Sequence, residues 1–492
     1  MTTDRARMIL LVLLVGCVAT ATATAASPNL QGFQQVRRPG WPHLVDLMRA
    51  GLRFQQARVQ VGNCMPSRNV MWSGRYPHTN GVQGFQQVRR PGWPHLVDLM
   101  RAGGYFTGIR GKVSHSTPYH PYGWDVVLDS EPDNPHIKDA ASYGESTRRG
   151  IELSREAGRP FCLVINVSDP HKPFYGMTKR SESGTDPHPT SRVFSPDEVP
   201  IPGFLFDHPE VRRELAHYYS SVRRADDAVG AILDALRASG AVDETFVMFL
   251  SDHGMPLPFA KTALWHHSTH TPLIIRWPQV TRPGSVDDSH LVSAIDFLPT
   301  LLDVAGVEHP PGLQGRSFLP LVKGEPSDGW DMTVTEYHEN SGGFHNPMRS
   351  VHTERFGYIY NPWSNGERTF KTATTGTLTY RTMQQLAETN DGVAARLRFF
   401  DLRVPEEFYD YQNDPDGLHN LIGDPAFALE IERHRELLRD WMRRTDDPLR
   451  EAFTSLGDAA AQEAYMQSLE PRRPRKTPAN RQRRSEEPIE CR

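Results

Sequence analysis

The segment from Asn63 to Arg75 reads NCMPSRNVMWSGR and combines a cysteine with proline, serine and arginine at close spacing. Pro66 suits the first turn of an α-helix, because the N–H group that proline lacks would have no partner there. Cys64 then lies at the start of that helix, where unpaired backbone N–H groups favour a developing negative charge. Arg68 follows one turn later and can stabilise the same charge. The pattern indicates that Cys64 is a candidate reactive cysteine.

The other three cysteines have different surroundings. Cys17 lies in an apolar N-terminal stretch, Cys162 in the run FCLVINV, and Cys491 in an Arg-rich tail. Four cysteines spread over 492 residues are no disulfide framework. Cys162 is expected to be a buried, inert thiol. Cys64 alone lies in a polar, Arg-flanked segment.

Two apolar runs end in residues that can do chemistry. FCLVINV is followed by SDPH, and ETFVMFL is followed by SDHG. Between about residues 150 and 310, strand-like runs of this kind alternate with amphipathic helices, which predicts an α/β domain with a largely parallel sheet. A long helix is expected over residues 209–240, with Gly240 as its stop.

The pattern changes after about residue 337. Hairpin-like segments such as MRSVHTERFGYIYNPW precede a helical stretch near residues 425–445, which predicts a smaller α+β subdomain over 337–470. Residues 471–492 are rich in Arg and Pro and are expected to be a disordered, basic tail. The catalytic domain is expected over 27–336.

The N-terminal residues have the composition of a secretory signal. Arg5 and Arg7 precede an apolar run from Met8 to Val15, and small residues follow. The run is too short to span a bilayer, so we expect a cleaved signal over 1–26, an exported protein and no transmembrane segment. The tetrapeptide LVGC, which ends at Cys17, is similar to the lipobox of bacterial lipoproteins. Lipid attachment there and ordinary cleavage are equal alternatives.

One sequence block occurs twice. QGFQQVRRPGWPHLVDLMRAG spans residues 31–51 and again 83–103. Solenoid repeats diverge and recur at least three times, so this pair is no repeat architecture. It indicates a recent duplication or an error of sequence assembly. The first copy is the suspect one, because the second continues naturally into a helix, a glycine and a strand.

The charges are nearly balanced. Lys and Arg number 55, and Asp and Glu number 59. No global basic field attracts a polyanion, so we expect no nucleic-acid partner. An acidic substrate must be held by a local pocket.

The residues CMPSR from Cys64 and SGR from Ser73 resemble the defining motif of the type I sulfatases. The resemblance implies an alkaline-phosphatase-like sulfatase fold, with a large mixed or parallel sheet flanked by helices. It also implies that a maturation enzyme oxidises Cys64 to formylglycine. One hydroxyl of the hydrated aldehyde attacks sulfur, Arg68 stabilises its alkoxide, and deprotonation of the second hydroxyl expels sulfate. A phosphatase or phosphodiesterase of the same superfamily would use Ser or Thr and usually two metals.

Further segments resemble the parts of this family that contact sulfate. In GKVSH, Lys112 matches a lysine that contacts sulfate, and His115 a histidine that orients a diol hydroxyl. In SDPHKPF, His171 matches a substrate-contacting histidine and is a candidate proton donor to the leaving group. Lys261 lies where the family has a Lys or Arg over the sulfate.

The metal ligands match only in part. Asp252 and His253 resemble the second pair of calcium ligands in the family, so the resemblance implies a calcium ion. The first pair is normally an Asp-Asp at the end of an opening strand, and here the expected signal occupies that place. The strand therefore looks absent, and an ion without two of its carboxylates should bind weakly. An inactive, exported protein that binds sulfated glycans is the alternative to an enzyme.

Longer segments point to one branch. NPMRSVHTERFGYIYN and the segment around residues 211–262 are similar to the sulfamidases, which cleave the N-sulfate of glucosamine in heparan sulfate. A sulfated sugar or glycosaminoglycan is the expected partner, a carbohydrate O-sulfatase is the alternative, and a homodimer is compatible with the resemblance. The loop TEYHENSGGFHNPMR supplies candidate sugar contacts at His338, Glu339, His345 and Arg349.

Overall fold

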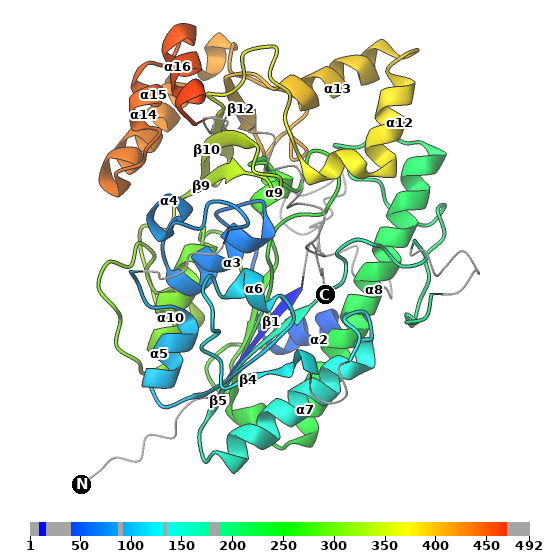
Figure 1. Cartoon of the computed structure of the whole chain (residues 1–492), viewed down its shortest axis with the longest axis vertical. Coiled ribbons are helices and arrows are strands. Elements are labelled where there is room, and N and C mark those ends of the chain that lie inside the picture. The colour runs from blue at the N-terminus through cyan, green and yellow to red at the C-terminus, as the bar shows by residue number, and fades with distance from the viewer. Residues whose placement is uncertain (1–8, 16–40, 87–91, 131–134, 178–185, 470–492) are drawn as a thin grey trace, which may run out of the picture.

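The computed structural model describes residues 9–15, 41–86, 92–130, 135–177 and 186–469, and Figure 1 shows their arrangement. An eight-stranded mixed sheet forms the larger part, and its strands lie in the order β4-β3-β5-β1-β6-β7-β2-β8. In that order they are β4 (Val126–Val127), β3 (Phe106–Arg110), β5 (Phe161–Val167), β1 (Ile9–Val15), β6 (Thr245–Ser251), β7 (Leu273–Arg276), β2 (Leu52–Phe54) and β8 (Ser285–Asp287). The neighbours from β4 to β6 are parallel, whereas β7 runs antiparallel to β6 and β2. The predicted fold class is confirmed.

Strand β1 lies in the middle of this sheet. Ile9–Val15 pairs in parallel with β5 on one side and with β6 on the other. Leu10 to Leu13 have no exposed surface, as expected for a strand that is covered on both faces and is apolar throughout. The expectation that the opening strand is absent is therefore wrong. The central position of β1 also conflicts with the predicted signal over 1–26, because cleavage after residue 26 would remove this strand.

Helices cover both faces of the sheet. Leu10 and Val12 pack with α3 (Cys64–Ser73), α5 (Leu96–Ala102) and α10 (Phe297–Ala305). Leu11 and Leu13 pack with α2 (Pro42–Ala50), α7 (Ala140–Glu156) and α8 (Pro209–Ala238). The alternation of side chains along β1 thus divides the core into two layers.

The duplicated block forms a helix in each copy. In the first copy, α2 buries Leu47 on the side of α8, and β2 follows it. In the second copy, α5 buries Leu96, Val97 and Met100 on the opposite face, and β3 follows it. The described part of the first copy is therefore an integral element of the fold. Residues 31–40 and 87–91 lie outside the described ranges.

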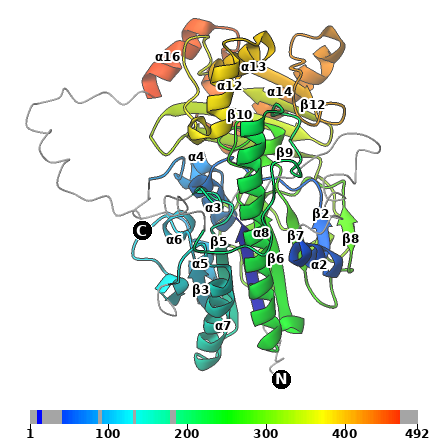
Figure 2. The same cartoon turned by 90° about the vertical axis from the view of Figure 1, so that its right-hand side faces the viewer.

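The C-terminal subdomain has a four-stranded antiparallel sheet in the order β12-β11-β10-β9. Its strands are β9 (Met332–Glu339), β10 (His345–Thr353), β11 (Phe356–Tyr360) and β12 (Glu406–Asp410). Its longer helices are α12 (Leu378–Leu386), α13 (Asp391–Leu402), α14 (Ala428–Thr445) and α16 (Ala459–Leu469). Figure 2 shows α8 running along the sheet as far as α12, where Glu214 accepts hydrogen bonds from the N–H groups of Leu378 and Thr379. The long helix joins the two parts.

Several sequence expectations concern residues outside the described ranges. These are lipid attachment at Cys17, the tail 471–492 with Cys491, and most of the expected signal. Within the described residues, no helix has the length and apolar character needed to cross a membrane. Cys162 is buried in the core, and burial raises the pKa of its thiol to about 12, which confirms the prediction of an inert cysteine.

Candidate active site

Cys64 is the first residue of α3. The side chain of Asn63 caps the helix by accepting a hydrogen bond from the N–H of Cys64 at 3.1 Å. Gly74 ends the helix in the left-handed region at φ 61°. Ser67 Oγ donates to the carbonyl of Asp252, just beyond β6, at 2.7 Å. The helix start is thereby fixed against the carboxyl end of the central strands.

Three side chains surround the thiol of Cys64. His253 Nε2 lies 3.2 Å from Sγ and Lys261 Nζ lies 3.5 Å from it. Burial alone would raise the pKa of Cys64, but the charges of Lys261 and His253 and a hydrogen bond from His115 hold this pKa well below its usual value. The site therefore stabilises a negative charge at position 64, where the anionic oxygen of a formylglycine hydrate would stand.

His253 is oriented by its neighbour. Its Nδ1 lies 2.9 Å from the carbonyl oxygen of Gly254 and donates to it. In the neutral ring, Nε2 then carries the lone pair and faces Cys64. This is the orientation that lets Nε2 accept a proton from residue 64 or bind a cation.

Arg68 spans the ends of the two strands that flank β1. Its Nη1 donates to Asn166 Oδ1 at 2.5 Å, near the end of β5. Its Nε and Nη2 lie 2.9 and 2.8 Å from Asp252 Oδ2, beyond the end of β6. The guanidinium is fully buried. Arg68, one turn after Cys64 on α3, thus balances the charge of Asp252, and its contact with an alkoxide at residue 64 stays a prediction.

Lys112, His115 and His171 belong to the same cluster. Asn69, on α3, donates to the carbonyl of His115 at 2.9 Å and holds that segment against the helix. Burial, together with the charges of Lys112 and Lys261, lowers the pKa of His171 to about 3. His171 Nδ1 donates to the carbonyl of Lys172 at 2.7 Å, so Nε2 is its lone-pair nitrogen. The structure brings the predicted sulfate-contacting residues together.

The backbone around the two lysines is strained. Lys112, Phe259 and Thr262 adopt left-handed conformations with φ of 52°, 64° and 66°. A non-glycine residue in this region is uncommon and needs support from its surroundings. Thr262, next to Lys261, receives such support because its N–H donates to the carbonyl of Gly62 at 2.7 Å.

The expected calcium ligands are close to one another but few. Donor atoms of Cys64, Asp252 and His253 lie within 4.8 Å of one another. Calcium takes six to eight oxygen ligands, whereas this group offers one carboxylate, whose Oδ2 already accepts from Arg68. The sequence has no Asp or Glu between Asp4 and Asp46, so none follows β1 directly. These residues do not fit a calcium ion held by several protein carboxylates.

The candidate sugar contacts divide into two groups. Arg349 is fully buried, 2.6 Å from Asp447 and 3.7 Å from Glu336. The prediction that it contacts substrate is therefore wrong. It is instead the cation of a buried network that also includes His78, and the charge of Glu336 raises the pKa of His78 against the effect of burial. His338, buried as well, lies 3.2 Å from Glu336 in the same network.

Glu339 and His345 form the second group. Their side chains are partly exposed and 3.6 Å apart. The carboxylate of Glu339 covers Gly84 so closely that a Cβ there would meet it at 1.9 Å. The next residue, Phe85, packs edge-on against His115, with ring centroids 5.5 Å apart. Glu339 thus lies over Gly84, the residue before the phenylalanine that packs on His115.

Three residues of the site were not predicted. Asn63 caps α3, Asn69 holds the His115 segment, and Asn166 binds Arg68. The signal for Asn166 was present, because it is the one polar residue in the run FCLVINV. Asn63 caps its immediate neighbour, whereas the partner of Asn69, His115, is 46 positions away in the sequence.

The chain matches known families along most of its length. A family model described as Sulfatase matches residues 24–307, and one described as N-sulphoglucosamine sulphohydrolase, C-terminal, matches residues 252–366. N-sulphoglucosamine sulphohydrolase from Homo sapiens is 31% identical over 448 residues, which cover 83% of this chain and 86% of the relative. Arylsulfatase K from Mus musculus is 26% identical, and the match covers 82% of this chain and 75% of the relative.

Solved structures share the fold. A protein in complex with its substrate D-glucosamine-2-N,6-O-disulfate has a TM-score of 0.64 at 17% identity, and the match covers 90% of this chain and 99% of that one. Phosphonate monoester hydrolase from Silicibacter pomeroyi has a TM-score of 0.61 at 19% identity, with 90% and 97% covered. At these identities the likeness concerns the fold alone.

Proposed function

Because the chain belongs to the sulfatase family, we propose that it hydrolyses a sulfate ester or sulfamate of a sugar, with residue 64 as the nucleophile. The observation that carries the proposal is Cys64 at the start of α3, with Lys261 3.5 Å from its thiol and His253 3.2 Å from it. A formylglycine at this position supplies a hydroxyl that attacks sulfur and a second one whose deprotonation releases sulfate. A formylglycine-generating enzyme is the partner that this chemistry requires.

The side chains around residue 64 divide the remaining tasks. The N–H groups of α3, together with Lys112 and Lys261, offset the negative charge of the sulfate. His253 Nε2 is placed to take the proton from residue 64. His171 donates a proton to the leaving atom once it is protonated, and the anionic sulfate favours this by raising the pKa of His171 from its low value in the free site.

N-sulfated glucosamine at the non-reducing end of a heparin-type chain is the proposed substrate. The match to the sulphohydrolase C-terminal family over residues 252–366 and the human relative support this choice. The leaving atom of a sulfamate is a nitrogen, which must be protonated as the bond to sulfur breaks. Glu339, which lies over Gly84 next to Phe85, is the proposed sugar contact.

Sulfate release from three compounds tests this function. Glucosamine N-sulfate, glucosamine 6-sulfate and an aryl sulfate are compared with wild-type protein and with Cys64→Ala, which removes the nucleophile. We expect turnover of the N-sulfate by the wild type only. Turnover of the 6-sulfate without the N-sulfate would assign a carbohydrate O-sulfatase instead.

A second function follows from the poor fit of the metal ligands. A chain with one carboxylate at the cation site can bind sulfated glycans through Lys112 and Lys261 without turning them over. Binding of heparin oligosaccharides by calorimetry, with no sulfate released at any calcium concentration, would support this function. Any release above the Cys64→Ala background rejects it.

A further inference from the structure

The segment that carries His171 is held at both of its ends. Asp169 precedes the histidine, and its carboxylate is buried and paired with two cations. Tyr175 and Gly176 follow it, and the N–H of Gly176 donates to Asp186 Oδ2 at 3.1 Å. His171 therefore lies on a short loop after β5 that is tied down on either side.

Helix α8 supplies one side of this support. His217, Ser221 and Arg224 have the spacing i, i+4, i+7 and so share one face of the helix. His217 donates to the carbonyl of Tyr175 at 2.8 Å, and Ser221 accepts from the N–H of Tyr175 at 2.6 Å. Arg224 Nε donates to Asp169 Oδ2 at 2.6 Å. One rigid helix thus binds the loop at three points.

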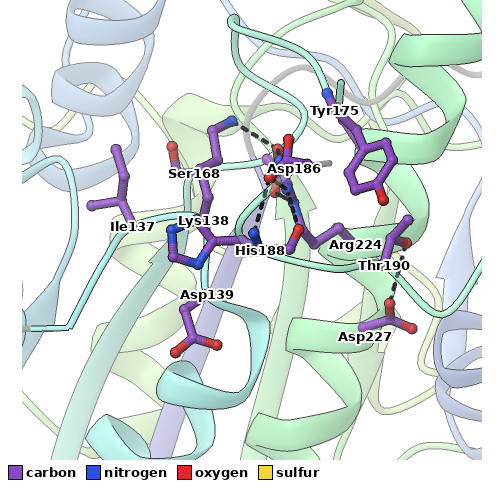
Figure 3. A network of polar contacts seen from close by, with 12 residues as sticks. Ile137, Lys138, Asp139, Ser168, Tyr175, Asp186, His188, Thr190, Arg224 and Asp227 are labelled. Carbon is purple, nitrogen blue, oxygen red and sulfur yellow. Dashed lines mark hydrogen bonds and ion pairs between the residues drawn. The ribbon is translucent and has the colours of Figure 1, made fainter. Parts of the chain in front are cut away.

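Arg224 also reaches a second carboxylate. Its Nη1 lies 3.2 Å from Asp186 Oδ1 and donates to the carbonyl of His188 at 2.7 Å. Figure 3 shows Lys138, which precedes α7, and Arg224, from α8, reaching toward the same group of carboxylates. Two cations and two carboxylates make this cluster neutral, which suits its burial.

Lys138 is the member that touches the histidine itself. Its Nζ donates to Asp169 Oδ1 at 2.7 Å and to the carbonyl oxygen of His171 at 2.6 Å. Only 7% of its side chain is exposed. A buried lysine that binds the main chain of a substrate-facing residue fixes the position of that residue directly.

We propose that Lys138 is a positioning residue for proton transfer by His171. Its ammonium group holds the His171 carbonyl and Asp169 together, and this sets where the imidazole stands relative to the leaving atom. As the bond from the oxygen of residue 64 to sulfur forms, the bond from sulfur to the leaving nitrogen breaks. Its electron pair takes the proton from the His171 imidazolium and leaves a neutral imidazole and a free amine. This inference rests on the proposed sulfatase function.

The test compares leaving groups. Lys138→Met removes both hydrogen bonds, and the exposed Lys323→Met is the matched control. A sugar sulfate needs a proton on its leaving atom, whereas 4-nitrophenyl sulfate does not. For the sugar sulfate that the wild type turns over, kcat should fall about 100-fold, because general acid catalysis contributes on the order of 100- to 10,000-fold. KM should stay within about twofold, and kcat for 4-nitrophenyl sulfate within about threefold.

A double-mutant cycle separates positioning from general damage. In a His171→Asn background, Lys138→Met should cause no further loss with the sugar sulfate, since the two residues act as one unit. Lys138→Gln can still donate to the carbonyl but carries no charge, so its kcat for the sugar sulfate should fall less than that of Lys138→Met. This variant also tests the proposal if the methionine variant misfolds. Equal losses with both substrates, or additive losses in the cycle, would overturn the inference. A wild type inactive on every sulfate would instead refute the proposed function.

Discussion

At the scale of single residues, the charge around position 64 decides what the site can do. Cys64 is buried, yet the charges of Lys261 and His253 hold its pKa well below the usual value. Arg68 is paired with Asp252. Lys261, whose Nζ lies 3.5 Å from the sulfur of Cys64, is the cation that we propose meets the reacting anion.

Replacing Lys261 should show this directly. Lys261→Met is expected to reduce kcat/KM for sulfate release by about 100- to 1,000-fold, the range seen when one group that stabilises transition-state charge is lost. Steady-state kinetics measure the effect, with the exposed Lys323→Met as the control. A loss no larger than that of the control would show that Lys261 does not face the sulfate.

The low pKa of His171 predicts proton uptake on binding. The free site holds this pKa at about 3, so the ring is neutral near neutral pH. An anionic sulfate beside the ring raises the pKa, so protons are taken up at any pH between the free and the bound values. Binding should therefore weaken as the pH rises through this window. Calorimetry of a sugar sulfate with Cys64→Ala, in buffers of different ionisation enthalpy, measures the uptake, which His171→Asn should abolish.

The ligand set at Asp252 predicts a weak response to calcium. One carboxylate bonded to Arg68 and one imidazole are a poor site for an ion that prefers many oxygens. The calcium concentration that gives half of the maximal rise in melting temperature should lie in the millimolar range, as it does for the weakest protein sites. Saturation at micromolar calcium would show that oxygen ligands from elsewhere complete the site.

At the scale of elements, strand β1 is the largest difference between the fold expected from the sequence and the observed fold. A short run of apolar residues without alternation describes both the core of a signal sequence and a strand buried on both faces. The run alone cannot separate the two, because the deciding contacts with β5 and β6 come from residues more than 140 positions away. In the same way, Arg349 follows a glycine-rich loop, but its partner Asp447 is 98 positions away.

Other parts were predictable because their causes are local. The helix start at Cys64 depends on Asn63 and Pro66, which are its neighbours in sequence. The strand ends at SDPH and SDHG follow directly from the apolar runs before them. The duplicated block marks the limit of local reasoning, since one sequence buries different side chains in α2 and in α5.

Substitutions in β1 test whether this strand belongs to the working protein. Leu11 is fully buried, so Leu11→Ala should lower the free energy of unfolding by about 2–5 kcal/mol. Leu429, 91% exposed on α14, gives the matched control Leu429→Ala, which should change little. Chemical denaturation measures both variants. If a purified protein that begins after residue 26 unfolds like the full chain, β1 is not part of the folded core and the assignment is contradicted.

At the scale of the whole molecule, the C-terminal subdomain packs against the segment that follows α3. Glu336 and Asp447 pair with His78 from the larger part, and Glu339 covers Gly84. Helix α8 links the two parts and also holds the loop of His171. Both subdomains therefore contribute residues around the proposed substrate site, and the sulfatase relatives match most of the chain.

The central claim is that residue 64 of this sulfatase-family chain becomes a formylglycine and acts as the nucleophile. Mass spectrometry of the tryptic peptide from Val59 to Arg68, prepared from a host with maturation machinery, tests this most directly. The account predicts the mass of the aldehyde or its hydrate in place of the thiol, and sulfate release in proportion to the converted fraction. A peptide that carries only unmodified Cys64, in a preparation that still releases sulfate, would contradict it.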